Sequence, residues 1–233
     1  MAQVFNVFPT TIVVDVMQGH DKYVDDFEKV YSKYDYEPKI NKNGYVYNTT
    51  TSENSGNALL HLDNDLTDMF GEIALNVKKY IYEVLDYKRI FDVIITKSWL
   101  SRSRHSEDEL VWHSHFTSQI SFAYYLKTPP NSHLLKFFTP ANTNSVFEGN
   151  NTSEFKHGIE NFNLVNSSTF FIEPVAGSIV MFPSSVRHCT HSIDDNFEGE
   201  RLAIVGDVTL AYKEGITDYS QGYIHPKYWK VYP

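Results

Sequence analysis

The second half of the chain is built from short segments rich in β-branched and aromatic residues, separated by Pro, Asn and Gly. Such segments are typical of β-strands joined by turns. The pattern predicts strands over residues 91–100, 111–125, 134–139, 170–172, 178–182 and 201–211. Strands at this spacing, without intervening helices, indicate an antiparallel sandwich or barrel.

The first half of the chain has a different pattern. Apolar residues at three- and four-residue spacing predict helices over 23–31 and about 65–86, and Asp65 or Thr67 is a candidate cap for the second helix. The opening segment, 4–16, is expected to form an edge strand interrupted by Pro9. The polar segment 36–57 is expected to be a loop with one strand at 45–47.

The charge of the chain restricts its partners. The 29 acidic residues exceed the 20 basic ones, which gives a formal net charge of −9. No basic patch of useful size interrupts this excess, so no nucleic-acid polymer is expected as a partner. A single nucleotide or base stays open.

The cysteine count and the amino terminus bear on the compartment. Cys189 is the single cysteine, so no intrachain disulfide can form, and a reducing compartment is the natural interpretation. The amino terminus lacks the basic region of a secretory signal. No stretch approaches the roughly 20 apolar residues of a membrane span. We therefore expect a cytoplasmic protein without a membrane partner.

Three of the ten histidines form a candidate metal site. His113 and His115 lie in the expected strand 111–125, where residues i and i+2 project from the same face. His188 follows a glycine, an apolar strand and a polar tip, which could deliver it to the mouth of a barrel. Two neighbouring histidines alone often bind no metal. His191 is either a partner of the site or a rival ligand, and we favour the first.

Arg201 and Tyr125 are candidates for binding an anion beside that metal. Arg201 opens the last strand, and a guanidinium that faces an apolar interior requires an anionic partner. The planar group suits the distal carboxylate of a dicarboxylate. Tyr125 is at even spacing from His115 and could donate its hydroxyl to the same carboxylate, with Tyr124 packing outward. The alternative is an arginine whose head reaches solvent.

These residues resemble those of the 2-oxoglutarate/Fe(II) oxygenases, and in particular a bacterial and phage branch of unassigned substrate. The resemblance rests on Phe8-Pro9-Thr10, on Ser98-Trp99 with His113-Ser114-His115, and on the segment from Ser121 to Leu126. It continues through the stretch from Pro174 to His188 and the strand Arg201-Leu202-Ala203-Ile204. The Tyr-Tyr-Leu segment at 124–126 is also similar to that of prolyl hydroxylases.

The resemblance implies a mainly β fold with a double-stranded β-helix (jelly-roll) core and N-terminal flanking α-helices. The sequence shows no internal repeat, heptad array or clear linker, so we expect one domain over 1–233, with a helical annex at about 20–87 and the β-helix core at about 88–215. The resemblance also implies Fe(II) as cofactor, 2-oxoglutarate as cosubstrate and O2 as oxidant. The expected reaction hydroxylates a C–H bond and releases succinate and CO2, in the host cytoplasm if the protein is phage-encoded.

One position departs from the family pattern. The usual ligand set is two histidines and one carboxylate, and here His115 stands at the carboxylate position. Either all three histidines bind the metal, or His115 stands aside and water or a remote acid takes its place. Asp108 and Glu109 are substitute acids, but both are expected to be solvated. Three neutral imidazoles would leave the charge of the iron unneutralised by the protein.

The sequence does not specify the substrate, which could be a small molecule, a peptide side chain or a modified base. The segments 129–134 and 140–166 are candidates for loops that gate the pocket, and the second could instead be a surface excursion. One alternative is a cupin with a three-histidine site that needs no 2-oxoglutarate. Another is a non-catalytic β-sandwich. The aromatic tail 223–232 could cover a homodimer interface or an edge of the barrel itself.

Overall fold

The computed structural model describes residues 3, 9–32, 37–40, 46–49, 59–104, 106, 108–139, 160–193, 197–216 and 222–232. The helices are α1 (His20–Tyr31) and α2 (Thr67–Lys79), which continues as a π-helical segment, Tyr80–Val84. Short 3-10 turns lie at Leu60–Leu62, Asn64–Leu66 and Pro226–Tyr228. The strands are β1 (Val13–Val16), β2 (Glu37–Ile40), β3 (Val46–Thr49), β4 (Phe91–Ser103), β5 (Ile120–Lys127), β6 (Leu134–Phe138), β7 (Thr169–Ile172), β8 (Ser178–Pro183), β9 (Arg187–His191) and β10 (Arg201–Tyr212).

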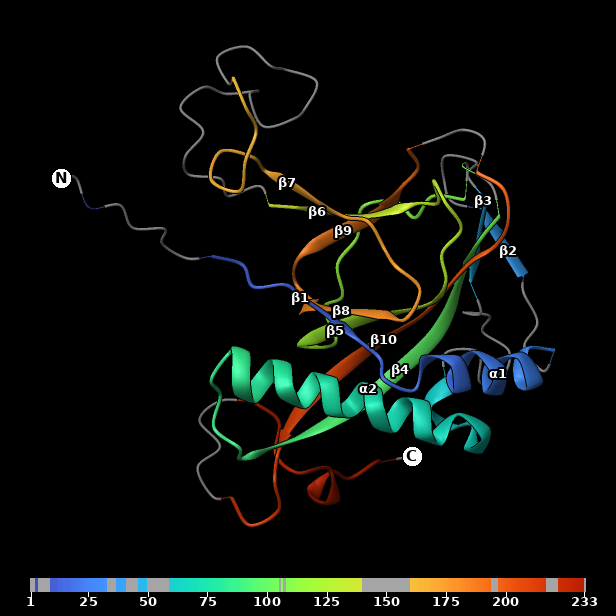
Figure 1. Cartoon of the computed structure of the whole chain (residues 1–233). Coiled ribbons are helices and arrows are strands. Elements are labelled where there is room, and N and C mark those ends of the chain that lie inside the picture. Colours follow the sequence, from blue (N-terminus) through green and yellow to red (C-terminus); the bar gives the residue numbers. More distant parts are fainter. Residues whose placement is uncertain are drawn as a thin grey trace.

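Two antiparallel sheets make up the body of the molecule. The larger has the strand order β1-β8-β5-β10-β4-β3-β2, and the smaller has the order β7-β6-β9. In Figure 1 the two helices lie along one side of the large sheet, and the small sheet lies on its other side. The prediction of a mainly β fold with N-terminal flanking helices is confirmed.

The central strands of the large sheet divide their side chains between two cores. On β5, Tyr124 packs into the core beneath the helices, whereas Tyr125 packs into the core between the sheets. On β10, Ile204 packs into the core beneath the helices and Ala203 into the core between the sheets. Both faces of these strands are buried, so their sequences are nearly continuous runs of apolar residues. Alternate side chains still point to opposite faces of the sheet.

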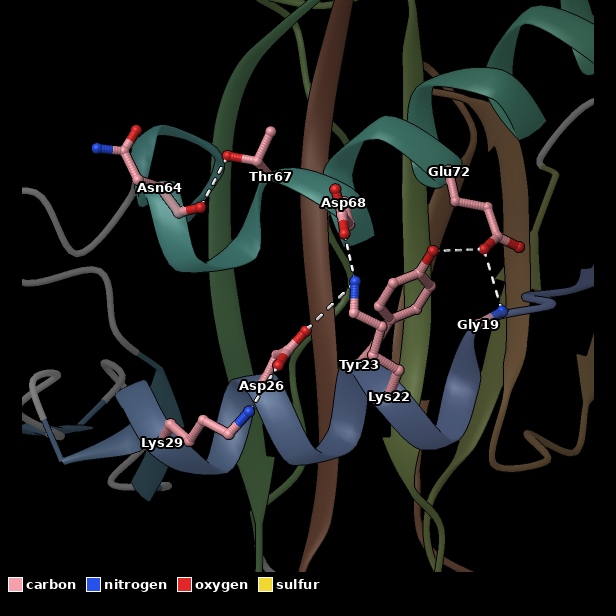
Figure 2. Close-up of polar contacts among 9 residues, drawn as sticks. All are labelled: Gly19, Lys22, Tyr23, Asp26, Lys29, Asn64, Thr67, Asp68 and Glu72. Atoms are coloured by element: carbon pink, nitrogen blue, oxygen red, sulfur yellow. Dashed lines mark hydrogen bonds and ion pairs between the residues drawn. The ribbon is translucent and has the colours of Figure 1, made fainter.

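Polar contacts join α1 to α2 and fix where α1 begins (Figure 2). The Glu72 carboxylate on α2 accepts hydrogen bonds from the Gly19 backbone N–H, at 3.1 Å, and from the Tyr23 hydroxyl, at 2.7 Å. Lys22 also pairs with Asp68 across the two helices. Because no side chain of α1 caps its own first turn, the Glu72 carboxylate on α2 supplies the hydrogen-bond acceptor for the backbone N–H at the start of α1.

The first half of the chain differs from the sequence prediction at α1, in the segment 36–57 and at the start of the second helix. The α1 helix begins at His20, before the first apolar residue of the periodic pattern. The segment 36–57, expected to be a loop with one strand at 45–47, forms β3 near that position and also a second strand, β2, which pairs with it. The cap also differs, because α2 begins after Leu66 without a side-chain cap, and Asp63 instead caps the 3-10 turn Asn64–Leu66, where its side chain accepts the Asp65 backbone N–H at 2.9 Å.

The opening strand is shorter than expected. Only Val13–Val16 of the segment 4–16 forms a strand among the described residues, and it pairs with β8 at the edge of the large sheet. Residues 4–8 lie outside the described part of the chain. Within the described part, no helix has both the length and the apolar character to cross a membrane.

Candidate metal centre

His113, His115 and His188 meet in a cavity of about 680 Å³ that extends between the two sheets. One nitrogen from each ring lies within 4.8 Å of the other two. The ring centroids of His113 and His188 are 4.2 Å apart, and each is 5.2 Å from that of His115. Three imidazoles at this separation can bind one divalent ion.

The backbone that presents these rings differs from the expected one. β5 begins at Ile120, so His113 and His115 precede the strand, and the same-face argument from strand geometry was wrong. His188 lies inside β9, a strand that was not predicted. His113 and His188 are joined by reciprocal backbone hydrogen bonds of 3.0 and 2.9 Å, an isolated antiparallel bridge. This bridge, not a shared strand, brings the rings together.

Hydrogen bonds fix the orientation of two of the rings. Nδ1 of His113 lies 2.7 Å from the Val111 carbonyl oxygen, and Nδ1 of His188 lies 2.9 Å from the Val186 carbonyl oxygen. A carbonyl oxygen only accepts hydrogen bonds, so Nδ1 must carry the hydrogen in both rings. The Nε2 lone pair of each ring is therefore free to bind a metal ion.

His115 is held on three sides. Its backbone N–H donates to the Ser184 carbonyl at 2.9 Å, and its ring stacks on Trp99 at a centroid distance of 5.7 Å. Its Nδ1 donates to Oδ1 of Asp207 at 2.5 Å. The Ser121 hydroxyl also contacts that oxygen at 3.3 Å. As in the other two rings, the hydrogen on Nδ1 leaves Nε2 as the free nitrogen.

Burial keeps two of these imidazoles neutral. It lowers the pKa of His188 to about 3, with a further contribution from His113 next to it. It also lowers the pKa of His113. Because a metal ion binds the neutral ring, both side chains are ready to act as ligands at neutral pH without losing a proton.

Arg201 and Tyr125 line the same cavity. Arg201 is 2% exposed, and its Nε and Nη1 have no hydrogen-bond partner among the described residues. The guanidinium lies over the Tyr125 ring, 5.0 Å from its centroid, and the buried Tyr125 hydroxyl also has no partner within the described chain. Burial lowers the pKa of Arg201 and raises that of Tyr125. Unpaired buried donors of this kind suit a carboxylate.

Other sequence candidates lie apart from the three histidines. Nδ1 of His191 lies 3.4 Å from a Glu109 carboxylate oxygen. Among the described residues, His191 is not part of a cluster of side chains that could bind a metal ion. Asp108 is buried and accepts the Arg104 backbone N–H at 2.7 Å, so the expectation that it is solvated was wrong. The candidate gating loop 140–166 is described only from residue 160 onward.

Asp207 is the site residue that the sequence analysis missed. It is 2% exposed, lines the cavity and contacts His115 directly. It lies six residues after Arg201 on β10, and an even spacing places both on the same face of a strand. The alternation that was applied to Tyr125 would therefore have found Asp207 as well.

Comparison with known proteins assigns this part of the chain to a family. Residues 97–207 match a family model described as "Putative 2OG-Fe(II) oxygenase". They belong to the 2OG-Fe(II) oxygenase family. The matched span of this oxygenase domain contains all three histidines together with Tyr125, Arg201 and Asp207. The family is one of oxidoreductases that use Fe(II), 2-oxoglutarate and O2.

Solved structures share the fold of the oxygenase domain. A Pseudomonas putida prolyl-4-hydroxylase is 13% identical, with coverage of 85% of this chain and 92% of that one and a TM-score of 0.52. A 2OG-Fe(II) oxygenase family oxidoreductase from Burkholderia pseudomallei is 10% identical over 84% of each chain, with a TM-score of 0.55.

The epimerase SnoN, solved with Fe3+, alpha ketoglutarate and nogalamycin RO, is 12% identical over 89% of this chain and 83% of that one, with a TM-score of 0.53. Identities this low establish the fold alone, and they confirm the predicted double-stranded β-helix. A search of curated proteins found no match.

Proposed function

We propose that His113, His115 and His188 bind Fe(II) and that Arg201 and Tyr125 bind 2-oxoglutarate. The domain would hydroxylate a C–H bond of a small molecule or peptide, with release of succinate and CO2. One observation carries the proposal. Three free imidazole nitrogens and an unpaired buried guanidinium share one cavity, in a span that matches the oxygenase family.

The three histidines supply ligands of the right chemistry. Imidazole nitrogen suits Fe(II), and three ligands leave open positions for a chelating cosubstrate and for O2. The hydrogen bonds at Nδ1 direct Nε2 of each ring toward the ion and limit rotation of the rings. When bound, iron chelated by 2-oxoglutarate supplies the oxidising chemistry, and the protein positions the reactants.

Arg201 and Tyr125 would receive the distal carboxylate of 2-oxoglutarate. A buried guanidinium without an acidic partner is costly, and an anion offsets that cost. The free Nε and Nη1 of Arg201 can form a two-point contact with a carboxylate, and the Tyr125 hydroxyl can donate a third hydrogen bond. A dicarboxylate would then extend from Arg201 toward the three rings along the cavity that they all line.

Apolar side chains from both sheets enclose the inner part of this cavity. Ala123, Leu135 and Phe182 are buried and line the same cavity as Arg201 and the histidines. They exclude water and so strengthen the electrostatic contacts made inside. Val111 and Phe116 also line the cavity and are exposed, Phe116 by 90%. We assign them to the open side, from which a substrate would approach the metal.

The proposal is tested by adding 2-oxoglutarate to the Fe(II)-loaded protein without oxygen. A visible metal-to-ligand charge-transfer band is expected, and the same experiment with succinate is the control. Stoichiometric iron without such a band would instead support a cupin-type enzyme that needs no 2-oxoglutarate. The third imidazole, His115, is the observation that favours that alternative. Failure to bind iron at all would refute both.

We also infer that the protein works in the cytoplasm. Its single cysteine, Cys189, is buried as a free thiol, and burial raises its pKa to about 12. A protein without disulfides and with Fe(II) chemistry suits a reducing compartment. Fractionation of cells that express the protein tests this, and recovery from a secreted or membrane fraction would contradict it.

A further inference from the structure

We propose that Asp207 supplies the negative charge of the metal site, acting through His115. In the usual ligand set a carboxylate binds the metal directly. Here the carboxylate would lie one residue further out and reach the metal through an imidazole ring. The inference rests on the proposed function, because it requires that His115 binds the ion through Nε2.

The geometry places Asp207 directly behind His115. Its Oδ1 accepts the Nδ1–H of His115 at 2.5 Å, on the opposite side of the ring from the free Nε2. The Ser121 hydroxyl contacts the same oxygen at 3.3 Å, and Ser121 is itself hydrogen-bonded to Ser184 at 2.9 Å. Trp99 stacks against the imidazole. The carboxylate and the ring are therefore both held in one arrangement.

Among the described residues, no basic side chain other than His115 forms an ion pair with the Asp207 carboxylate. The Asp207 side chain is 3% exposed, and His115 Nδ1 lies 2.5 Å from its Oδ1. Lys97 lies opposite Asp207 in the sheet register, but its amino group reaches the Thr117 hydroxyl at 3.3 Å and is exposed. A buried carboxylate without a cation is strongly unfavourable. A divalent ion on Nε2 of His115 would provide the missing positive charge.

The same arrangement resolves the charge deficit of a three-histidine site. Three neutral imidazoles leave both positive charges of the ion unneutralised. A carboxylate that accepts the Nδ1–H makes the imidazole a stronger donor and adds one negative charge close to the metal. The total charge then equals that of two histidines and one carboxylate. Asp207 is a positioning residue in this account, since it touches neither the metal nor the substrate.

The test is a titration of the purified protein with Co(II), followed by its visible absorption and by competition with a chelating dye. Asp207→Asn keeps the size of the side chain and an oxygen that can accept the Nδ1–H, but it removes the charge. We expect Co(II) affinity to fall by about 10- to 100-fold and the absorption bands to shift. Asp108→Asn removes a different buried carboxylate on the same domain, and it should bind Co(II) like the wild type.

The His115→Ala background separates the two proposals. If Asp207 acts through His115, adding Asp207→Asn to His115→Ala should change Co(II) affinity no further. Wild-type affinity in Asp207→Asn, or an equal loss in both backgrounds, would overturn the inference and leave the three-histidine site intact. Absence of Co(II) binding by the wild type would instead refute the proposed function.

A folding failure of Asp207→Asn would not end the test. Ser121→Ala removes one hydrogen bond to the carboxylate and leaves every ligand in place. It should weaken Co(II) binding several-fold in the wild type and not in the His115→Ala background. An effect of the same size in both backgrounds would count against a route through His115.

Discussion

Replacement of Arg201 by methionine should change the stability of the protein and its response to 2-oxoglutarate in opposite directions. Arg201 is 2% exposed, and two nitrogens of its guanidinium have no partner in the described chain. Methionine fills a similar volume without a charge. Arg201→Met therefore removes an unfavourable buried charge and, with it, the group that would bind the cosubstrate.

The magnitudes follow from these two effects. Replacement of a buried charge by an apolar side chain is neutral or raises the free energy of unfolding by about 1–4 kcal/mol. In a domain of this size each kcal/mol raises Tm by about 2–4 °C. A wild-type protein with 2-oxoglutarate at about 100 times Kd gains about 2.7 kcal/mol, equivalent to about 5–10 °C. Loss of a buried charged contact costs about 2–5 kcal/mol of affinity, which reduces that gain to under about 1 kcal/mol.

The assay is a thermal unfolding scan of the Mn(II)-loaded protein, with and without 2-oxoglutarate, because Mn(II) prevents turnover. Arg104→Met is the matched control. Arg104 is half exposed and pairs with Glu200 at 2.9 Å on the surface. A pair of this kind contributes at most about 1 kcal/mol. This control should keep the full response to the ligand.

Two results would refute the reasoning. A wild-type ligand response in Arg201→Met would show that another group binds the distal carboxylate. A fall in Tm of the ligand-free variant by several degrees would show that the guanidinium is stabilised without the ligand. The first result would separate Arg201 from cosubstrate binding, the second would refute an unfavourable buried charge, and both would leave the metal centre untested.

Three further predictions concern the same cavity. His188→Ala should lose stoichiometric iron on dialysis, because two protein ligands bind weakly, and retention of one iron per chain would exclude His188. The metal-free protein should lose about 2 kcal/mol of stability between pH 7 and pH 5, measured by urea unfolding. The unfolded His188 takes up a proton near pH 6.5, whereas the folded one, with its pKa lowered to about 3, does not. His188→Gln should flatten this dependence, and an unchanged slope would contradict it. Gly206→Ala should destabilise the protein by about 1–3 kcal/mol, because a Cβ would lie 2.5 Å from Phe122 Cζ and 2.6 Å from the Lys97 carbonyl oxygen. Unfolding at the wild-type urea midpoint would show that the strands move apart freely.

The sequence was sufficient for the strands and helices with a clear residue pattern. β4, β6, β8 and β10 lie where segments rich in β-branched and aromatic residues, bounded by turn signals, predicted them. β3 lies near the strand expected at 45–47, whereas β2 carries no apolar period and was missed. The pairing of β2 with β3 and of β3 with β4 is a tertiary contact that no local pattern encodes. β9 was missed for a related reason, since Arg187 to His191 is a polar run that becomes a strand by pairing with β6.

The structure brings the predicted site residues into one cavity, although part of the sequence argument that grouped them was wrong. Strand periodicity was extended back over His113 and His115, which in fact precede β5. The distant contact between His113 and His188 depends on how β9 meets the segment before β5, and chain order does not specify it. Asp207 was within reach of the sequence argument, because its spacing from Arg201 is even. It was missed because an acid in a strand was not considered as a partner of an imidazole.

The backbone bridge between His113 and His188 fixes the positions of these two residues without using their side chains. The two hydrogen bonds use only N–H and carbonyl groups, which every amino acid except proline supplies in full. A different side chain at either position would therefore still be presented from the same point in space. The side chains at positions 113 and 188 can therefore be replaced, in the laboratory or in evolution, while the backbone that positions them stays the same.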